Sequence, residues 1–287
     1  MGPALSAARL AAVLVLGCTL PALARDGFYR FPAVRCATVL FTAEGDLWRV
    51  PVTGCRAERV TTQSDLEQSP ALLADGRLVA FSNANERAGE AYLMPLDGGL
   101  PQRLTWDGQT PRVWGLTPVG EVLLTAPTTR DPGTQPFAID LTTLARRTLP
   151  AGQASDGALS PDGRTLFFTR RGLATDNVRA YRGGAMAQLW RLAVADRAEA
   201  VPLLPPDGNA QRPMPYVTLQ GLRVAFLSDR DGQINVWSVS AGGADLRQHT
   251  KHRSWDIRSA AIDGARIVYA LGADLRLLDL SSDRDKR

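Results

Sequence analysis

Few residues in this sequence could perform nucleophilic or acid–base chemistry. The only histidines are His249 and His252, and no serine lies in a Gly-x-Ser-x-Gly turn. A nucleophile needs an adjacent base and a third group that orients that base. Both histidines fall in or just after the last strand of one sequence repeat, where a surface or turn role is expected. The sequence therefore predicts no catalytic residue in this chain.

Metal chemistry is equally unsupported by residue spacing. Cys36, Cys55 and the two histidines stand at distances that match no usual zinc site. The Asp-rich string at 229–232 lacks the alternating oxygen ligands and the closing Glu of a calcium loop. Asp and Gly are typical of tight hairpin turns, so we expect a turn there. No metal and no other cofactor are predicted.

One segment outside the repeats carries several cations. Residues 170–188 make the fourth repeat longer than the others and contain Arg170, Arg171, Arg179 and Arg182. Long loops on rigid β scaffolds often carry function. We expect these arginines to form a contact surface for a peptide or a neighbouring domain. The alternative is a solvated insertion without a partner.

The amino terminus has the pattern of a secretory signal peptide. Arg9 precedes a short apolar run, and small residues end at Ala24. The run is too short to span a bilayer. We expect residues 1–24 to be removed and the mature chain, 25–287, to be periplasmic or secreted. In the alternative, residues 15–18 resemble a lipoprotein box and Cys18 carries a lipid anchor.

Export would make Cys36 and Cys55 candidates for a disulfide, because that compartment oxidises thiols. If Glu44 and Gly45 form a tight turn, Cys36 falls opposite Thr53, two residues from Cys55. A bridge is then within reach. The alternative is two separate buried thiols that act as small apolar residues.

The charge pattern argues against a nucleic-acid partner. The chain has 33 basic and 29 acidic residues, a net charge of +4, and almost all of its cations are scattered arginines. A nucleic-acid surface would need a basic stripe with aromatic residues between the charges. We expect a solvated, Arg-rich surface around a core that the 45% of hydrophobic residues can fill.

Two repeated elements must position whatever functional residues exist. The first is an Asp-Gly turn between apolar runs, at 75–76 and 162–163, with related turns at 116–120, 218–221 and 261–264. The second is a strand with a central aromatic residue at 48, 92, 137, 190 and 237, and a sixth copy at 274–278. Period-2 alternation and Gly-bounded turns are strand signals. We expect the aromatic residues to pack one repeat against the next.

Six such units predict an all-β fold, a six-bladed β-propeller over residues 25–287. The blades are expected at roughly 28–62, 66–106, 110–150, 155–204, 211–251 and 256–287. The sequence ends soon after the third strand of the last unit. We therefore expect the sixth blade to be incomplete and to lack its fourth strand.

The order of the strings outside the repeats resembles the amino-terminal propeller of tricorn-like serine peptidases. Single-blade motifs are shared with TolB-like and prolyl-oligopeptidase propellers, so the order is the more specific feature. The matching strings are 27–32 leading into 44–48, then 96–99 with 103–105, 181–184 with 189–191, 226–232 and 255–259.

The resemblance implies a non-catalytic domain that serves as a channel and docking surface for peptides in proteolysis. In that family a second propeller, a PDZ-like domain and a catalytic domain with its serine follow, and none of these lies in this sequence. The implied partners are peptides and downstream peptidase domains or other subunits. The alternative is a stand-alone periplasmic propeller of the TolB kind, and the missing fourth strand is expected to favour the peptidase.

Overall fold

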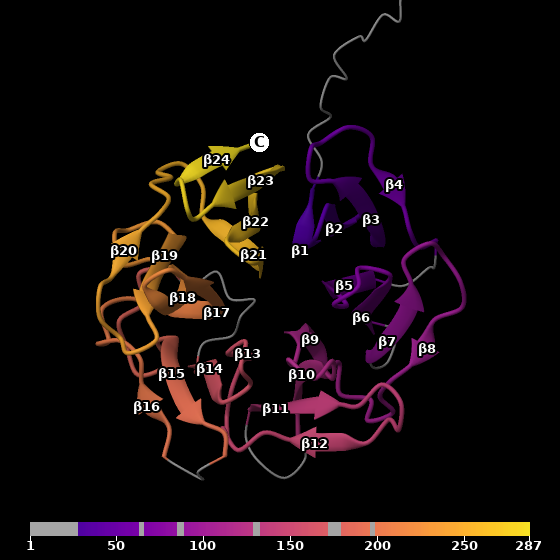
Figure 1. Cartoon of the computed structure of the whole chain (residues 1–287), viewed down its shortest axis with the longest axis horizontal. Helices are drawn as coiled ribbons and strands as arrows, with labels where there is room; N and C mark the ends of the chain where they lie inside the picture. The colour runs from indigo at the N-terminus through magenta and orange to yellow at the C-terminus, as the bar shows by residue number, and fades with distance from the viewer. Residues whose placement is uncertain (1–27, 63–65, 85–88, 129–132, 172–178, 196–198) are drawn as a thin grey trace, which may run out of the picture.

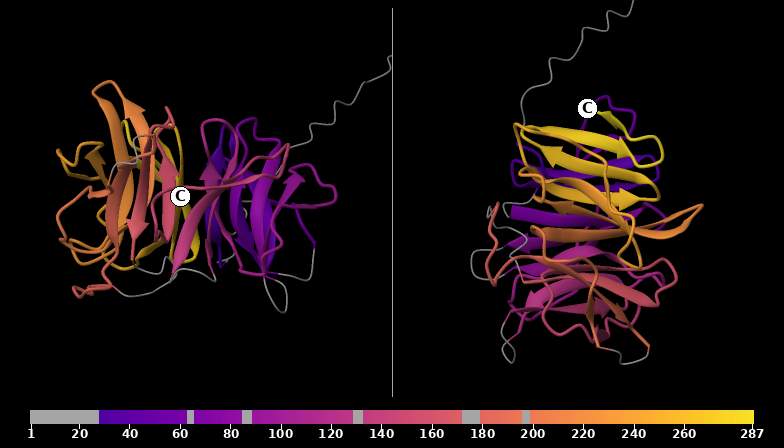
Figure 2. Two further views of the ribbon diagram at one scale, coloured as in Figure 1. Left: turned by 90° about the horizontal axis from the view of Figure 1, so that it is seen from below. Right: turned by 90° about the vertical axis from the view of Figure 1, so that its left-hand side faces the viewer.

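The computed structural model describes residues 28–62, 66–84, 89–128, 133–171, 179–195 and 199–287. Within these residues every regular element is a β-strand, and the strands form six four-stranded sheets. The sheets stand around a common axis (Figure 1), and the side views show them packed against one another as a ring (Figure 2). The predicted all-β, six-bladed propeller is confirmed.

Each blade is a continuous stretch of chain. Blades 1 to 3 contain β1 (Arg30–Arg35), β2 (Thr38–Ala43), β3 (Asp46–Pro51) and β4 (Glu58–Arg59); β5 (Leu66–Leu72), β6 (Leu78–Ala84), β7 (Glu90–Pro95) and β8 (Gln102–Arg103); and β9 (Arg112–Leu116), β10 (Val122–Pro127), β11 (Thr134–Ile139) and β12 (Arg146–Thr148). Blades 4 to 6 contain β13 (Asp156–Leu159), β14 (Thr165–Arg170), β15 (Gln188–Ala193) and β16 (Val201–Pro202); β17 (Ala210–Thr218), β18 (Gly221–Ser228), β19 (Asn235–Ser240) and β20 (Arg247–Gln248); and β21 (Ile257–Asp263), β22 (Arg266–Leu271), β23 (Asp274–Asp279) and β24 (Arg284–Lys286). All neighbours pair antiparallel, and the first strand of each blade lies nearest the axis (Figure 1).

The repeated Asp-Gly turns join the first and second strands. In the turn between β5 and β6, Gly76 has a φ of 69° and donates its N–H to the Leu73 carbonyl at 2.8 Å. The Asp75 carboxylate accepts the Arg77 N–H at 2.9 Å. Glycine adopts this left-handed conformation without a steric penalty, and Asp satisfies the freed backbone donor. The motif therefore specifies where each hairpin reverses.

A second repeated contact ties the outer strand to the third strand. Thr61, Thr105 and Thr250 follow the fourth strands of blades 1, 2 and 5, and each is buried. Their hydroxyl oxygens accept the N–H groups of Leu47, Ala91 and Val236 at 2.8, 2.9 and 2.9 Å. Because these donors are buried, the threonines remove the cost of leaving them unpaired.

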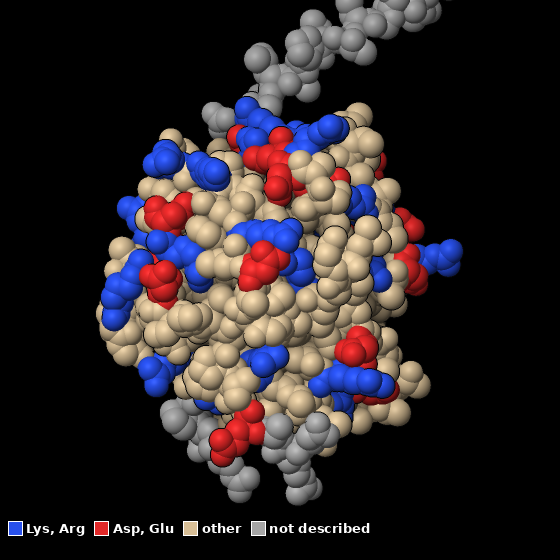
Figure 3. Space-filling model, turned by 60° about the vertical axis from the view of Figure 1, so that its left-hand side comes forward, with Lys and Arg blue, Asp and Glu red and all other residues tan. Residues whose placement is uncertain are grey.

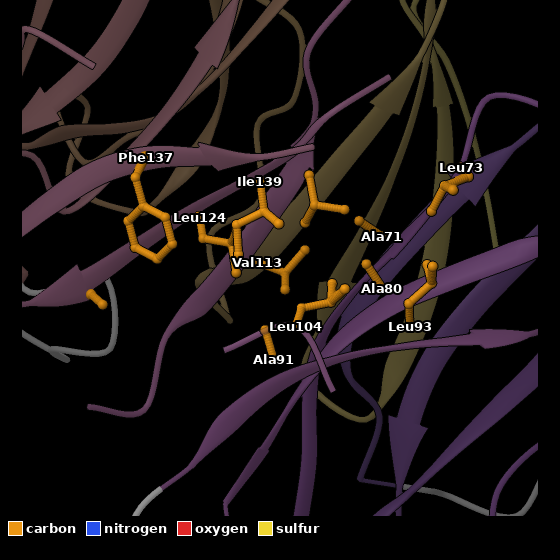
Figure 4. Packing of buried hydrophobic residues seen from close by; sticks show 12 residues of the cluster. Ala71, Leu73, Ala80, Ala91, Leu93, Leu104, Val113, Leu124, Phe137 and Ile139 are labelled. Carbon is orange, nitrogen blue, oxygen red and sulfur yellow. The ribbon is translucent and has the colours of Figure 1, made fainter. Parts of the chain in front are cut away.

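The core is divided among the junctions between blades. Six clusters of buried side chains each join two neighbouring blades, including blades 6 and 1. Figure 4 shows the cluster between blades 2 and 3, where Leu104 of blade 2 lies next to Val113 of blade 3. The aromatic residues at 48, 92, 137, 190 and 237 all belong to or pack against these clusters, which confirms their packing role.

The expectation of an incomplete sixth blade is wrong. Residues Arg284–Lys286 form β24, which pairs with β23 in the register Leu277↔Lys286. The chain reverses in a short turn, where the Asp279 carboxylate accepts the Ser281 N–H at 2.8 Å. The few residues after that turn are enough to form an outer strand of three residues.

The ring closes between blades 6 and 1 without a shared strand, because every blade has its own four strands. At this seam the Asp263 carboxylate accepts the Cys36 N–H at 2.8 Å and forms ion pairs with Arg35 and Arg266. Val268 packs against side chains of β1 and β2 in the same place. In the described part of the chain no strand pairing crosses this seam, and each hydrogen bond across it has a side chain on at least one side.

Candidate functional site

The innermost strands are irregular where they pass the axis. The strand pairing shifts register in five of the six, namely β1, β5, β9, β17 and β21. Phe31, Ser69 and Arg212 lie at three of these bulges with φ of 49°, 49° and 59°, and each precedes a proline. Non-glycine residues rarely adopt this conformation, and bulges re-aim side chains. Strain of this kind is often found at functional sites.

Three charged side chains meet at this level of the axis. Asp156, at the start of β13, is only 1% exposed. Its Oδ2 accepts the backbone N–H of Arg212 at 2.9 Å, and the Arg212 Nε donates to the Ala260 carbonyl at 2.8 Å. Arg112 of β9 lines the same narrow hollow, whose volume is about 30 Å³. We call Phe31, Arg112, Trp114, Asp156 and Arg212 the waist of the channel.

Aromatic rings hold the guanidinium groups of the waist in place. The Arg112 Cζ lies 4.7 Å from the centre of the Trp114 ring and 5.7 Å from that of Phe31. The Arg212 Cζ lies 4.9 Å from the Trp114 centre. Trp114 is fixed by its Nε1–H, which donates to the Thr125 hydroxyl at 2.6 Å. Cation–π contacts of this kind stabilise a desolvated cation.

The waist is electrostatically unbalanced. Burial, followed by repulsion from Arg212, lowers the pKa of Arg112 to about 10. Burial also lowers the pKa of Arg212 and raises that of Asp156. Two cations share one carboxylate in surroundings that solvate charge poorly. The lining of the waist therefore carries more positive than negative charge.

On one side the waist opens into a wider cavity of about 540 Å³, which we call the funnel. Every blade contributes an apolar residue to its wall: Val34, Leu72, Leu116, Leu159, Pro215 and Ile262. Its charged lining residues are Arg35, Asp263 and Arg212, of which the first two pair with each other. The funnel is thus an apolar cavity with a cation at its narrow end.

The sequence matches a family model described as the tricorn protease N-terminal β-propeller domain over residues 26–284. The chain belongs to this family. It is 35% identical to "Tricorn protease homolog 1" of Streptomyces coelicolor over 268 residues, which cover 92% of this chain and 24% of the relative. The chain thus spans about a quarter of the length of that curated relative.

Solved structures agree with the tricorn propeller fold. The crystal structure of the tricorn protease superposes with a TM-score of 0.79 at 18% identity, over 91% of this chain and 26% of that chain. A TolB structure from Agrobacterium tumefaciens superposes with a TM-score of 0.64 at 21% identity, over 77% of this chain and 80% of that chain. At these identities the likeness concerns the fold.

The arginines singled out in the 170–188 segment do not line the channel of the tricorn-type propeller. Arg170 stacks on Trp190, with its Cζ 4.2 Å from the ring centre. Arg171 donates to the Gly184 carbonyl. The role of this surface as a peptide or domain contact stays a prediction, and residues 172–178 lie outside the described residues.

Arg179 and Arg182 bind acidic residues of the next blades. Arg179 lies 3.6 Å from Asp256, and Arg182 lies 3.4 Å from the buried Asp229. On the face drawn in Figure 3, basic and acidic side chains are interspersed in the same way. These two arginines therefore attach their segment to the ring.

The sequence interpretation missed Arg112 and Arg212 as site residues. A usable signal was present, because Arg212 precedes Pro213 on a first strand, as Ser69 precedes Pro70 and Phe31 precedes Pro32. The repeated residue-proline step marks the level of the axis at which the side chains converge.

His249 takes part in a Ser–His–Asp arrangement. Its Nε2 lies 2.8 Å from the Ser238 hydroxyl, and its Nδ1 lies 2.5 Å from the Asp283 carboxylate. Ser238 is fully buried and accepts N–H groups of Arg223 at 3.0 and 3.3 Å. A substrate cannot reach this oxygen in the structure, so the arrangement supports a link between blades 5 and 6.

His252 makes a second link between the same blades. Its Nε2 lies 2.8 Å from the Tyr269 hydroxyl and 3.8 Å from Asp285, which also pairs with Arg276. Burial lowers the pKa of His252. The folded chain therefore binds this proton less readily than the unfolded chain, whose histidine has a pKa of about 6.5.

We expect stability to fall as the pH drops below about 6.5, because protonating His252 then favours the unfolded chain. Thermal unfolding at pH 7.5 and pH 5.5 should show a lower Tm at pH 5.5. The variant His252→Gln should show a smaller drop, whereas His249→Gln, which keeps His252, should retain it. An equal drop in the wild type and His252→Gln contradicts this assignment.

Cys36 and Cys55 are both exposed and are free thiols in the structure. The register that would bring them near each other is present, because Ala43 pairs with Asp46 and the Val52 N–H donates to the Ala37 carbonyl at 2.9 Å. The structure does not contain the bridge itself. The disulfide stays a prediction, which a count of free thiols would test.

Among the described residues, no group of three or more His, Cys, Asp or Glu side chains is placed to hold a metal ion. The same residues contain no helix that is long and apolar enough to cross a membrane. The segment with the proposed signal peptide and Cys18 lies outside the described residues.

Proposed function

We propose that this propeller is a non-catalytic domain of a tricorn-type serine peptidase, which docks to peptidase domains or subunits and presents its axial channel to peptides. The observation that carries the proposal is the funnel, an apolar cavity on the axis that ends at the partly buried cation Arg212. A peptide offers the matching groups, because it combines apolar side chains with carboxylates. Membership of the tricorn propeller family supports the peptidase as the setting.

In this proposal the chain contributes recognition and the catalytic serine is supplied by another domain. Ser238 is buried against Arg223 and is a poor nucleophile. Proteolysis would take place in the periplasm or outside the cell, where the signal-like segment 1–24 would direct the chain.

A second candidate is a stand-alone periplasmic propeller of the TolB kind, which binds peptides or partner proteins in its funnel. The closed seam and the four strands of blade 6 favour this candidate, since the ring needs no further strand. A missing fourth strand would have favoured the peptidase domain, and the complete blade 6 removes that support. The family match supports the peptidase instead.

A chimera tests the first proposal. We expect the Streptomyces coelicolor relative to hydrolyse peptides when this propeller replaces its own, because the shared fold should dock in the same place. Peptide hydrolysis and sedimentation of the chimera, the intact relative and the relative without a propeller provide the comparison. A chimera that assembles correctly but cleaves no better than the protein without a propeller rules out the docking and channel role.

A further inference from the structure

A second hollow, with a volume of about 480 Å³, lies on the face of the ring opposite the funnel. Blade 5 forms its wall from the turn after β18 and from the segment after β20, and blade 4 adds one arginine. Val217, which pairs with Leu222 at the start of β18, lines the funnel, so the two cavities lie at opposite ends of β18. We call this cavity the basic hollow, and its lining includes Arg179, Asp231, Gln233, Gln248, Lys251 and Arg253.

The basic hollow contains two exposed cations without a counter-charge. Lys251 and Arg253 lie two residues apart, and neither forms an ion pair or a hydrogen bond with a residue in the described part of the chain. Many arginines of the ring are instead paired with carboxylates, as Arg103 is with Glu90. Neighbouring uncompensated cations create a local positive potential that attracts anions.

The other charged groups of the hollow do not cancel this potential. Arg179 adds a third cation, 3.6 Å from the Asp256 carboxylate. Asp231 is the one carboxylate among the described lining residues, and one of its oxygens already accepts the Gln248 side-chain N–H. The lining therefore has a net positive charge, and the complementary partner is negative.

Two glutamine side chains narrow the class of that partner. Gln233 accepts the Arg179 N–H through its Oε1 at 2.5 Å, which leaves its Nε2–H donors without a described partner. Gln248 donates through its Nε2, which leaves its Oε1 as an acceptor. A peptide unit carries one donor and one acceptor and matches both groups. A chain of phosphate groups offers acceptors only and would leave the Gln248 oxygen unpaired.

We propose that the basic hollow binds an acidic segment of another polypeptide chain. Lys251 and Arg253 pair with its Asp or Glu side chains, and Gln233 and Gln248 bind its backbone. This inference goes beyond the proposed function, because it concerns the face opposite the funnel and does not require a peptide in the channel.

Fluorescence anisotropy with a labelled short peptide tests the proposal. The peptide alternates Glu with Ser and has both ends blocked, and a comparison peptide has Gln in place of each Glu. We expect the acidic peptide to bind the full chain at least about fivefold more tightly at low salt, since each exposed ion pair contributes a factor of up to about five. High salt should remove most of this preference by screening.

A pair of double variants locates the binding. Lys251→Gln with Arg253→Gln should weaken binding of the acidic peptide at least about fivefold. The control, Arg77→Gln with Arg164→Gln, removes two exposed arginines without ion pairs from turns between first and second strands. It makes the same change in net charge, and we expect it to alter the affinity less than about twofold.

Asp231→Asn provides a readout of the opposite sign. It removes the carboxylate of the hollow but keeps an oxygen that accepts the Gln248 N–H. We therefore expect the acidic peptide to bind more tightly, by about twofold or more. A gain in affinity cannot arise from unfolding of the variant.

Three results would overturn the proposal. Absence of binding, or equal binding of the two peptides, shows that the hollow does not select acidic side chains. Equal losses in the two double variants show that binding follows net charge alone. Inorganic polyphosphate that displaces the acidic peptide at a lower concentration of charge identifies a phosphate site instead of a polypeptide site. None of these results bears on the funnel or on the docking role, which the chimera tests.

Discussion

Replacing Asp156 with Asn should lower the free energy of unfolding by about 2 kcal/mol, because it removes the one carboxylate from the lining of a hollow that holds Arg112 and Arg212. This is below the roughly 3–5 kcal/mol for breaking a fully buried ion pair, since both arginines are only partly buried. Asp156 is 1% exposed and is the carboxylate that faces the cations of the waist. The amide can still accept the Arg212 N–H, but it leaves Arg112 and Arg212 without a counter-charge. Urea unfolding of the wild type and the variant measures the loss.

A matched substitution separates this effect from the loss of one charge anywhere in the protein. Asp75 is exposed and accepts one backbone N–H from Arg77, so Asp75→Asn should cost less than about 0.5 kcal/mol. Adding Arg112→Met to Asp156→Asn should restore part of the stability, because it removes one of the two uncompensated cations. A loss below about 1 kcal/mol for Asp156→Asn would mean that the waist is solvated well enough to need no counter-charge.

The second large effect is expected at Asp229. Its carboxylate is 1% exposed and accepts the Asn209 N–H and the Asn209 side-chain amide, both at 2.8 Å. It also accepts the Ala180 N–H at 2.7 Å and pairs with Arg182. Asp229→Ala removes all four contacts. We expect a loss of about 3 kcal/mol, because each hydrogen bond to a charged group contributes roughly 1.5–3 kcal/mol and the partly exposed donors recover some of it by binding water.

The same variant should expose the segment from Arg179 to Arg182 to protease. Trypsin cleaves after arginine, so limited digestion followed by mass spectrometry should show faster cleavage after Arg179 and Arg182. Asp231→Ala, two residues away on the exposed side of the same turn, should digest like the wild type. If Asp229→Ala is cut no faster than Asp231→Ala, the segment is held by other contacts.

The sequence was sufficient to predict the propeller because its local signals repeat. Asp75 and Gly76 mark a turn by their own backbone preferences, and an aromatic residue stands at the same position of the third strand in five of the blades. Such information is contained within a few residues of chain. Six copies of it leave little choice of fold.

The fourth strand of blade 6 could not be predicted in the same way. Arg284, Asp285 and Lys286 have no apolar alternation, because this outermost strand buries none of its three residues fully. Its pairing is decided by the free edge of β23 and by the turn at Asp279. Both features lie in the folded blade rather than in the three residues themselves.

The candidate site was hidden for a related reason. Arg112, Asp156 and Arg212 come from three blades and meet only because the bulged first strands converge on the axis. Conversely, Arg182 looked available for a partner because nothing in the sequence shows that Asp229, which lies 47 residues away, faces it. Spacing along the chain carries little information about contacts between repeats.

The seam between blades 6 and 1 has a consequence for how such rings can change over generations. Each blade takes all four strands from one uninterrupted segment, and the junction that closes the ring consists of side-chain contacts. Duplicating or deleting one such segment would leave every remaining strand with its present hydrogen-bonding partner. A single duplication or deletion of a blade segment could therefore change the number of blades in such a ring. Only the packing between the newly adjacent blades would have to be re-established.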